Sequence, residues 1–271
     1  YENFKKEKVI DNAFILAFKK LINMTVSSNK IEKIGTLKAK EIKNLIESFQ
    51  IKNEKFKNNE YSALIEVNFN RQNTFLFFEK KNIFPSIPLK KELIILPIFV
   101  DEASQDIFIF NKNPFFENWN KNVKSYHLLK YVLPSEDIDI INVLNKEINN
   151  LEEFEFSKLV QNYNFKDYIV CLIYDEKDRY KVYSKIKIKN KNKIVSKSYP
   201  KNNINEPKIL ENLINDFKKV YEDEWKEINK INRSVKLAIN LSLSSSNFER
   251  NIEFQKFLSS TDQISKYSIK N

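Results

Sequence analysis

The sequence predicts an α+β or α/β protein, with a small helix-hairpin-helix domain, a mixed-sheet α/β sandwich domain and a C-terminal β-α-β unit. Three observations favour this fold class. Apolar residues recur at helical spacing in several segments, and in other segments they alternate with polar residues as in half-buried strands. The run from Leu93 to Val100 is apolar throughout, which is typical of a strand buried on both faces.

Residues 1–84 are expected to form the N-terminal α+β domain. Helical spacing of apolar residues is clearest from Val9 to Asn23. A shorter helix, a hairpin around a Lys-Asn-Asn turn and a third helix capped by Asn70 or Asn73 follow. Their expected ranges are 37–46 for the helix, 48–56 and 61–69 for the strands, and 70–83 for the last helix.

Two prolines, Pro85 and Pro88, indicate a linker, because each disfavours helix in the residue before it. The central domain, residues 89–230, then begins with the apolar strand at 93–100. Pro97 has no N–H to donate to a neighbouring strand, so we expect it at a bulge, a strand end or an edge. A second strand is expected at 106–110.

Helices and a three-stranded meander complete the central domain. Ser135 is the expected cap of a helix within 133–148, whose buried stripe would be Ile138, Ile141, Leu144 and Ile148. The later elements are a helix at 154–164, strands at 167–175, 178–189 and 192–199, and a long amphipathic helix at 207–229 with Phe217, Tyr221 and Trp225 in its apolar stripe.

The strand at 178–189 has two chemically different faces. Its apolar residues alternate with lysines, so the lysines are expected to face solvent and to form a basic patch. The hairpin from Lys181 to Lys193 is therefore a candidate surface for an anionic polymer or a membrane. Its interaction candidates are Lys181, Lys185, Lys187 and Lys189.

Residues 231–271 are expected to form a β-α-β unit. Alternating apolar residues from Val235 to Leu243 predict its first strand, and Phe248, Ile252 and Phe257 predict the helix. The second strand would begin near residue 264. Because the chain stops within this apparent strand, we expect the unit to be truncated.

The segment NPFFENW, residues 113–119, concentrates aromatic side chains after the second strand of the central domain. We expect it to cover the end of the apolar strand, with Phe116 and Trp119 buried and Pro114 fixing the turn. The alternative is a ligand or partner site formed by Pro114, Phe115 and Trp119.

Residues that usually carry catalysis are sparse. His127 is the only histidine, Cys171 the only cysteine and Gly35 the only glycine of the 271 residues. Phosphate-binding loops need several glycines, and a zinc site needs more histidine or cysteine ligands. The sequence therefore predicts no catalytic residue, no cofactor and no metal. An unrecognised hydrolase stays open as an alternative, and it requires a pocket that joins His127 to a carboxylate or gathers two carboxylates.

The net charge of +10 comes almost entirely from lysines that are spread along the chain, since only four residues are arginine. Arginine is the preferred residue for bidentate contacts to phosphates and bases, so we expect no nucleic-acid partner. No run approaches the roughly 18 apolar residues that a membrane-spanning helix needs, so no transmembrane segment is expected.

Five segments carry a family likeness, namely NEKFKNNEYSALIEVNFN, IPLKKELIILPIFVD, NPFFENW, VLPSEDIDIINVL and FSKLVQNYNFKDYIVCLIY. In this order they resemble an uncharacterised envelope protein family of Gram-negative bacteria, the 2066 family of domains of unknown function. Phe115 stands where that family often has tryptophan, and Ser135 where it often has glycine. The matching positions are Glu54, Tyr61, Phe69, Leu96, Pro97, Asn113, Pro114, Trp119, Pro134, Asp137 and Tyr163.

The resemblance implies a secreted or periplasmic protein whose signal has been removed. Its organisation would be similar to small domains of envelope accessory proteins, such as the N-terminal domain of the Tol system's periplasmic component and certain lipoprotein activators. Those domains act by binding other proteins. We therefore expect a non-enzymatic interaction module whose partner is another envelope protein, with an envelope hydrolase or an anionic-surface binder as alternatives.

Overall fold

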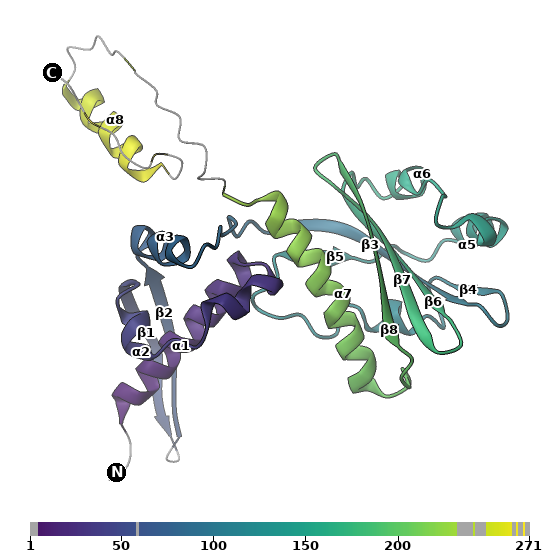
Figure 1. The fold of residues 1–271 in the computed structure, drawn as a ribbon, viewed down its shortest axis with the longest axis horizontal. Helices are drawn as coiled ribbons and strands as arrows, with labels where there is room; N and C mark the ends of the chain where they lie inside the picture. The colour runs from purple at the N-terminus through teal and green to yellow at the C-terminus, as the bar shows by residue number, and fades with distance from the viewer. Residues whose placement is uncertain are drawn as a thin grey trace. The chain divides into compact units, whose positions relative to one another are not determined.

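The computed structural model describes residues 5–57, 60–231, 241, 248–261, 264 and 268 (Figure 1). It divides into two compact units, Tyr1–Asn232 and Arg233–Asn271. The first combines helices with a two-stranded and a six-stranded sheet, which confirms the α+β fold class.

The N-terminal part of the first unit is a helix packed on a β-hairpin. Phe14 and Phe18 lie four residues apart on the first helix and face the hairpin, where the ring of Phe14 meets Phe49 edge-on at 5.1 Å. Gly35 ends the 3-10 helix with φ +71°, a conformation that favours glycine. The elements are α1 (Lys6–Thr25), η1 (Ser28–Ile34), α2 (Ala39–Lys43), β1 (Ile46–Lys57), β2 (Glu60–Phe69) and α3 (Arg71–Lys80).

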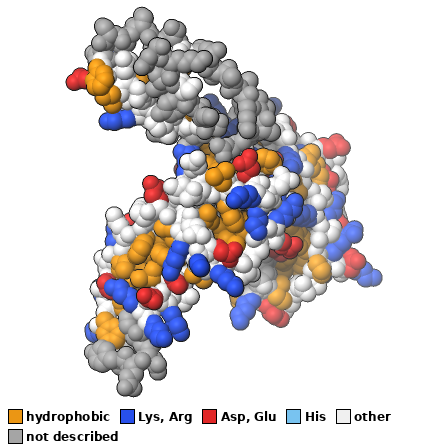
Figure 2. Space-filling view, turned by 60° about the vertical axis from the view of Figure 1, so that its left-hand side comes forward, with side chains coloured by type: hydrophobic (Ala, Val, Ile, Leu, Met, Phe, Trp, Pro, Cys, Tyr) orange, Lys and Arg blue, Asp and Glu red, His pale blue; other side chains and the backbone are white. Residues whose placement is uncertain are grey.

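These elements confirm the expected hairpin and its flanking helices. Asn70 caps α3 by accepting a hydrogen bond from the Asn73 amide at 2.9 Å. Apolar side chains also remain on the outside of this part, and Leu64 is 52% exposed. Figure 2 shows them interleaved with lysines on the molecular surface.

The central part is a mixed sheet in the order β4-β3-β6-β7-β8. β3 runs parallel to β6 and antiparallel to β4, while β5 pairs in parallel with the first residues of β3. The sequence did not predict β5. The strands are β3 (Lys91–Asp101), β4 (Asp106–Phe108), β5 (Leu129–Val132), β6 (Tyr168–Asp175), β7 (Arg179–Ile188) and β8 (Lys191–Pro200).

Pro97 lies where one side of β3 is open. β5 pairs with β3 only as far as Ile94, and β4 pairs with it only from Phe99 onward. Between these two points β3 has a strand neighbour on the β6 side alone. The structure thus confirms that Pro97 occupies a local edge. On that side no strand lies beside it, so its missing N–H interrupts no hydrogen bond between strands.

Helices cover both faces of this sheet (Figure 1). Alternate residues of β3 enter two different cores: Leu93 and Ile95 pack with α7 (Pro207–Ile228), and Ile94 and Leu96 pack with the opposite layer. That opposite layer consists of α5 (Ile138–Lys146), η2 (Ile148–Asn150) and α6 (Ser157–Gln161). The apolar run of β3 is explained by burial on both sides.

The expected cap of α5 was wrong, and its expected stripe was partly right. Asp137, not Ser135, caps the helix by accepting from the Asp139 amide at 2.8 Å. Leu144 is buried and Ile141 packs against the same core as expected, but Ile138 is 75% exposed and Ile140 is buried instead.

In the second unit, α8 (Phe248–Ser260) confirms the helix expected in the tail. The two strands expected around it lie outside the described residues. Phe248 is 75% exposed, and the rings of Phe254 and Phe257 stack at 6.5 Å. Among the helices described in either unit, none combines the length and the apolar character that crossing a membrane requires.

Candidate functional site

The NPFFENW segment belongs to the core. Phe115 and Trp119 are both 0% exposed, and the Phe115 ring stacks on Phe217 of α7 at 5.8 Å. Phe116 is only half-buried, so the burial expected for Phe116 falls on Phe115 instead. Pro114 begins the short helix α4 (Pro114–Asn118). Phe115 and Trp119 therefore do not offer a partner any surface.

Asn113, the first residue of this segment, determines where α4 begins and holds it against the sheet. Its side chain is 0% exposed, and its Nδ2 donates to the carbonyl oxygen of Pro97 at 3.0 Å, on the open side of β3. Nδ2 also donates to the carbonyls of Phe108 and Ile109. Its Oδ1 accepts from two amides that begin α4. One amide group thus joins β3, β4 and α4.

The lysines of β7 do not form a solvated patch. Lys181 contacts Glu152 at 2.8 Å, Lys185 donates to the carbonyl of Phe154 at 2.8 Å, and Lys187 donates to Ser157 at 3.0 Å. All three are half-buried beneath the η2–α6 segment. The prediction of alternation was right, but the prediction that this face meets solvent was wrong.

Lys189, the fourth candidate of the row, contacts the end of α7. Its Nζ lies 2.7 Å from Oδ1 of Asn229 and 4.8 Å from the ring centre of Trp225. Its ammonium therefore also has partners within the first unit, although the residue itself is exposed.

A row of buried charged residues on α7, which the sequence reasoning missed, lies next to its apolar stripe. Lys218, Glu222 and Lys226 are 1%, 5% and 6% exposed. Each directly follows an apolar stripe residue, and the three recur at four-residue spacing. This spacing was the available signal: residues at i, i+4 and i+8 lie along one side of a helix, so the three side chains share a face that borders the apolar stripe. We call Lys218, Glu222 and Lys226 the charged row.

Each member of the charged row binds backbone from a different segment. Lys218 Nζ donates to the carbonyl of Trp119 at 2.5 Å. Both carboxylate oxygens of Glu222 accept from backbone amides at the start of β5, at 2.9–3.1 Å. Lys226 Nζ donates to the carbonyl of Val26 at 3.2 Å, at the end of α1. The row holds α4, β5 and the N-terminal part against one helix.

Burial shifts the protonation of two of these groups. Desolvation lowers the pKa of Lys218 to about 8, although nearby Glu222 opposes the shift. Desolvation also raises the pKa of Glu222, against the lowering effect of the hydrogen bonds from the Leu129 and Leu128 amides. Both groups are already engaged in holding backbone, which leaves them little capacity for a bound molecule.

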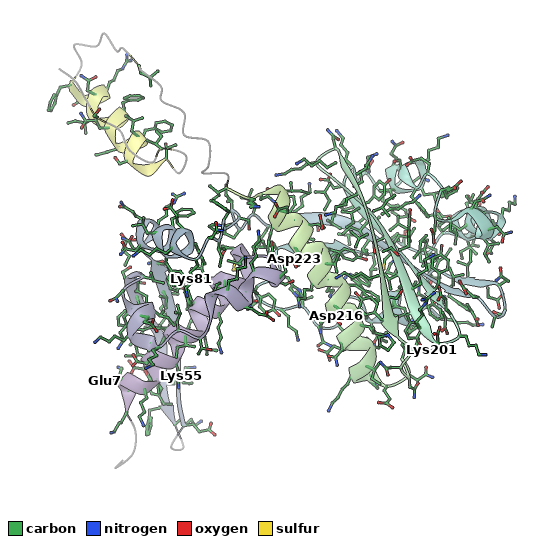
Figure 3. The ribbon with its side chains drawn as sticks, viewed as in Figure 1. Glu7, Lys55, Lys81, Lys201, Asp216 and Asp223 are labelled. Atoms are coloured by element: carbon green, nitrogen blue, oxygen red, sulfur yellow. The ribbon has the colours of Figure 1, made fainter. Side chains whose placement is uncertain are left out.

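Polar contacts join the N-terminal part to α7 beside this row. Asp223 accepts from the amide of Ser28 at 2.9 Å and from the Ser28 hydroxyl. In the linker after α3, the amide of Ile87 donates at 3.0 Å to the carbonyl of Asn229 at the C-terminal end of α7. Figure 3 shows Asp223 and Asp216 on the flank of α7 that faces α1. We call this set of contacts between the N-terminal part and α7 the joint. It is hydrogen-bonded and charged, in contrast to the apolar cores on either side.

Two clefts open on either side of this joint, and both include Ser28, Asp216 and Lys219. The β8 cleft, of about 510 Å³, lies between η1, β8 and α7. The His127 cleft, of about 400 Å³, lies between η1, the loop before β5 and α7. Both volumes fall within the range of small-molecule and peptide-side-chain pockets.

The β8 cleft has an unbalanced set of charges. Its acids Asp223, Glu224 and Glu227 each contact a lysine, with Glu224 receiving Lys193 at 2.6 Å. Within the described part of the chain, four further charged side chains of the cleft make no hydrogen bond or ion pair: Lys30, Lys197, Lys219 and Asp216. The unpaired charge of this cleft is therefore mainly positive.

The His127 cleft gathers the only histidine with carboxylates. Burial and the nearby cations, first Lys218 and then Lys124, lower the pKa of His127 to about 4, so its ring is neutral at neutral pH. Its Nδ1 accepts weakly from the Lys124 amide at 3.4 Å. Within the described ranges, no cluster of three or more histidine, cysteine and acidic residues is arranged to hold a metal.

No family model matches this chain, and neither a curated protein nor a solved structure matches it.

Proposed function

We propose that this chain is an interaction module of the bacterial envelope, exported to the periplasm, which binds another envelope protein and catalyses no reaction. The β8 cleft is the observation that carries the proposal. It is open, it has the volume of a binding pocket, and it presents charged side chains without partners in the described chain. Exposed unpaired charge beside a concave surface favours binding of a charged partner.

The resemblance to the 2066 family supports the envelope assignment. Several matched positions contact one another: Tyr61 donates to Glu54 at 2.8 Å, and Asn113 donates to the Pro97 carbonyl. Tyr163 donates to the carbonyl of Ser135 at 3.1 Å, next to the Asp137 cap.

The ionisable groups with perturbed pKa values support binding over catalysis. A catalytic acid or base needs an atom within hydrogen-bond reach of the substrate. Lys218 is buried against Trp119, and both oxygens of Glu222 accept backbone hydrogens. We infer that these groups stabilise the joint from which the clefts are formed.

Photo-crosslinking in the native envelope tests this function. A photoreactive residue is placed at position 219, which lines both clefts, or at position 146, which lies in α5 on the opposite layer. We expect one discrete crosslinked partner from position 219 and none from position 146. Absence of any specific product from position 219 in folded, exported protein would contradict the proposal.

An envelope hydrolase is the second candidate, because a hydrolase would need a pocket that joins His127 to a carboxylate, and the His127 cleft contains both. His127, Glu222 and Asp216 all line this cleft. The test is incubation of purified protein with peptidoglycan, with release of soluble fragments as the readout. Turnover that disappears in His127→Gln would replace the binding proposal with this one, and no turnover by wild-type protein removes the hydrolase.

A further inference from the structure

We infer that the β8 cleft binds a carboxylate-rich, extended segment of the partner protein. This inference rests on the proposed function and specifies the chemistry of its ligand. The chain's overall charge of +10 would attract any polyanion weakly and without a defined site. The β8 cleft differs from that general attraction because it concentrates unpaired ammonium groups around an apolar floor.

The lysines of the cleft come from three different elements. Lys30 lies on η1, Lys197 on β8 and Lys219 on α7. Lys197 and Lys219 are exposed, and Lys30 is half-exposed. Cations on three sides of a cleft can contact several carboxylates of one segment, whereas cations on one strand face only one side of it.

The floor of the cleft is apolar, which favours contact with the side chains of a peptide over binding of a bare ion. Val195, Lys197 and Tyr199 share one face of β8 because side chains in a strand alternate. Tyr199 packs edge-on against Phe217 of α7 at 5.3 Å, which places this face toward α7. Val195, Tyr199 and Val220 therefore supply apolar surface beneath the charged rim.

β8 also offers backbone groups to an extended ligand. It is the last strand in the sheet order, and among the described strands only β7 pairs with it. An edge strand can accept an added strand from another protein through main-chain hydrogen bonds. This feature favours an extended peptide over a lipid headgroup or polyphosphate, which have no backbone to pair.

The acids of the cleft do not cancel this preference. Glu224 is held by Lys193, Glu227 by Lys230, and Asp223 by Ser28 and Lys226. Asp216 is the one acid of the cleft without a partner in the described chain. Its charge opposes the lysines, so its replacement by lysine should tighten binding.

The test measures binding of the full chain to a fluorescein-labelled ten-residue Glu/Ser peptide by fluorescence anisotropy. The cleft variant is Lys197→Glu with Lys219→Glu. Its matched control is Lys146→Glu with Lys158→Glu, which makes the same change of net charge on α5 and α6. All four lysines are exposed and without a partner in the described chain.

We expect the cleft variant to bind at least about tenfold more weakly, as a loss of about 1.4 kcal/mol implies, and the control variant to stay within about threefold of wild type. Asp216→Lys should bind more tightly than wild type. Circular dichroism verifies that each variant is folded, and Lys197→Gln with Lys219→Gln supplies a milder version that should show an intermediate loss.

Three outcomes would overturn the inference. Equal losses in cleft and control variants would mean that only net charge matters. Polyphosphate or anionic vesicles bound as tightly as the peptide, and lost in the cleft variant, would assign the cleft to a non-protein polyanion. No peptide binding by wild type, together with a crosslinked partner from position 219, would leave the proposed function standing without this ligand chemistry.

Discussion

Replacement of Asn113 by alanine should be among the most destabilising single changes in the central part. The side chain is fully buried, and both ends of its amide are used. Loss of a helix cap costs about 1 kcal/mol. Each buried carbonyl left without a donor costs a further 1–3 kcal/mol or so, and the Pro97 carbonyl faces the open side of β3. We therefore expect a loss of about 4 kcal/mol, a large part of the roughly 5–15 kcal/mol of a typical domain.

Urea unfolding followed by tryptophan fluorescence measures this loss, because Trp119 lies at the end of the same segment. The slope of unfolding free energy against urea should stay unchanged while the midpoint falls. Asn118→Ala is the matched control: it is half-buried, and its side chain donates only to the Pro114 carbonyl. We expect it to cost less than about 1 kcal/mol. A similar small loss for Asn113→Ala would show that the Pro97 carbonyl finds another donor, and the reasoning would be wrong.

Three further predictions concern the same core. Lys218 has a folded pKa of about 8 against an ordinary 10.5, so the unfolded chain binds more protons between those values. The stability of wild type relative to Lys218→Met should therefore rise from pH 8 to 10.5, by up to about 3 kcal/mol, when urea titrations of the two proteins are compared at each pH. Tyr131→Phe removes a buried hydroxyl that has no partner in the described chain, so thermal melts should show no loss, or a gain of about 1 kcal/mol. Phe115→Ala should cost about 3–5 kcal/mol in the same melts, and Phe116→Ala clearly less, because only the first is fully buried.

Elements whose pattern is determined by burial could be predicted from the sequence. β3 is apolar on both sides because cores lie on both of its faces, and α7 shows one stripe because one of its sides packs on the sheet. The role of Pro97 also followed from its own chemistry, since a residue without N–H needs an open side. In each case the preference of the residues themselves, for burial or for an open strand edge, agrees with the environment that the fold provides.

β5 was missed because nothing local specifies it. Its four residues pair in parallel with residues of β3 that lie 38 positions earlier in the chain, such as Lys91 with Leu129. The amides at its start are bound by Glu222, 93 residues away for Leu129. Leu129, Lys130 and Tyr131 do alternate between buried and exposed, but an alternation over four residues is too short to identify a strand from the sequence alone.

The cap of α5 was predicted wrongly because two neighbouring residues can both act as a cap. Ser135 and Asp137 each carry a side-chain oxygen that can accept from a helix amide. With Asp137 as the cap, the helix begins at Ile138, and Ile140 and Leu144 lie in the core beneath the sheet. The expected stripe was right for Leu144 and Ile141 and wrong for Ile138, which is the first residue of the helix and is 75% exposed.

The lysines of β7 illustrate the same limit for a candidate site. Alternation correctly separated the two faces of the strand, but it does not say what lies above each face. The η2–α6 segment covers the lysine face and supplies a carboxylate, a carbonyl and a hydroxyl to the ammonium groups. No sequence pattern links Lys197 and Lys219 to each other or to Lys30. The three lysines come together only because three separate elements of the fold lie around one cleft.

The position of the β8 cleft on α7 connects binding to the stability of the joint. The charged row points inward from this helix and holds α4, β5 and the end of α1. Asp216 and Lys219 lie on the same helix and line the cleft. Lys226 binds the carbonyl of Val26, which lies just before η1, so a change to Lys226 is expected to alter the cleft although Lys226 does not line it. Loss of binding after such a change would reflect damage to the joint and not the loss of a ligand contact. The chemistry of the ligand is therefore tested by substitutions of the exposed residues Lys197, Lys219 and Asp216.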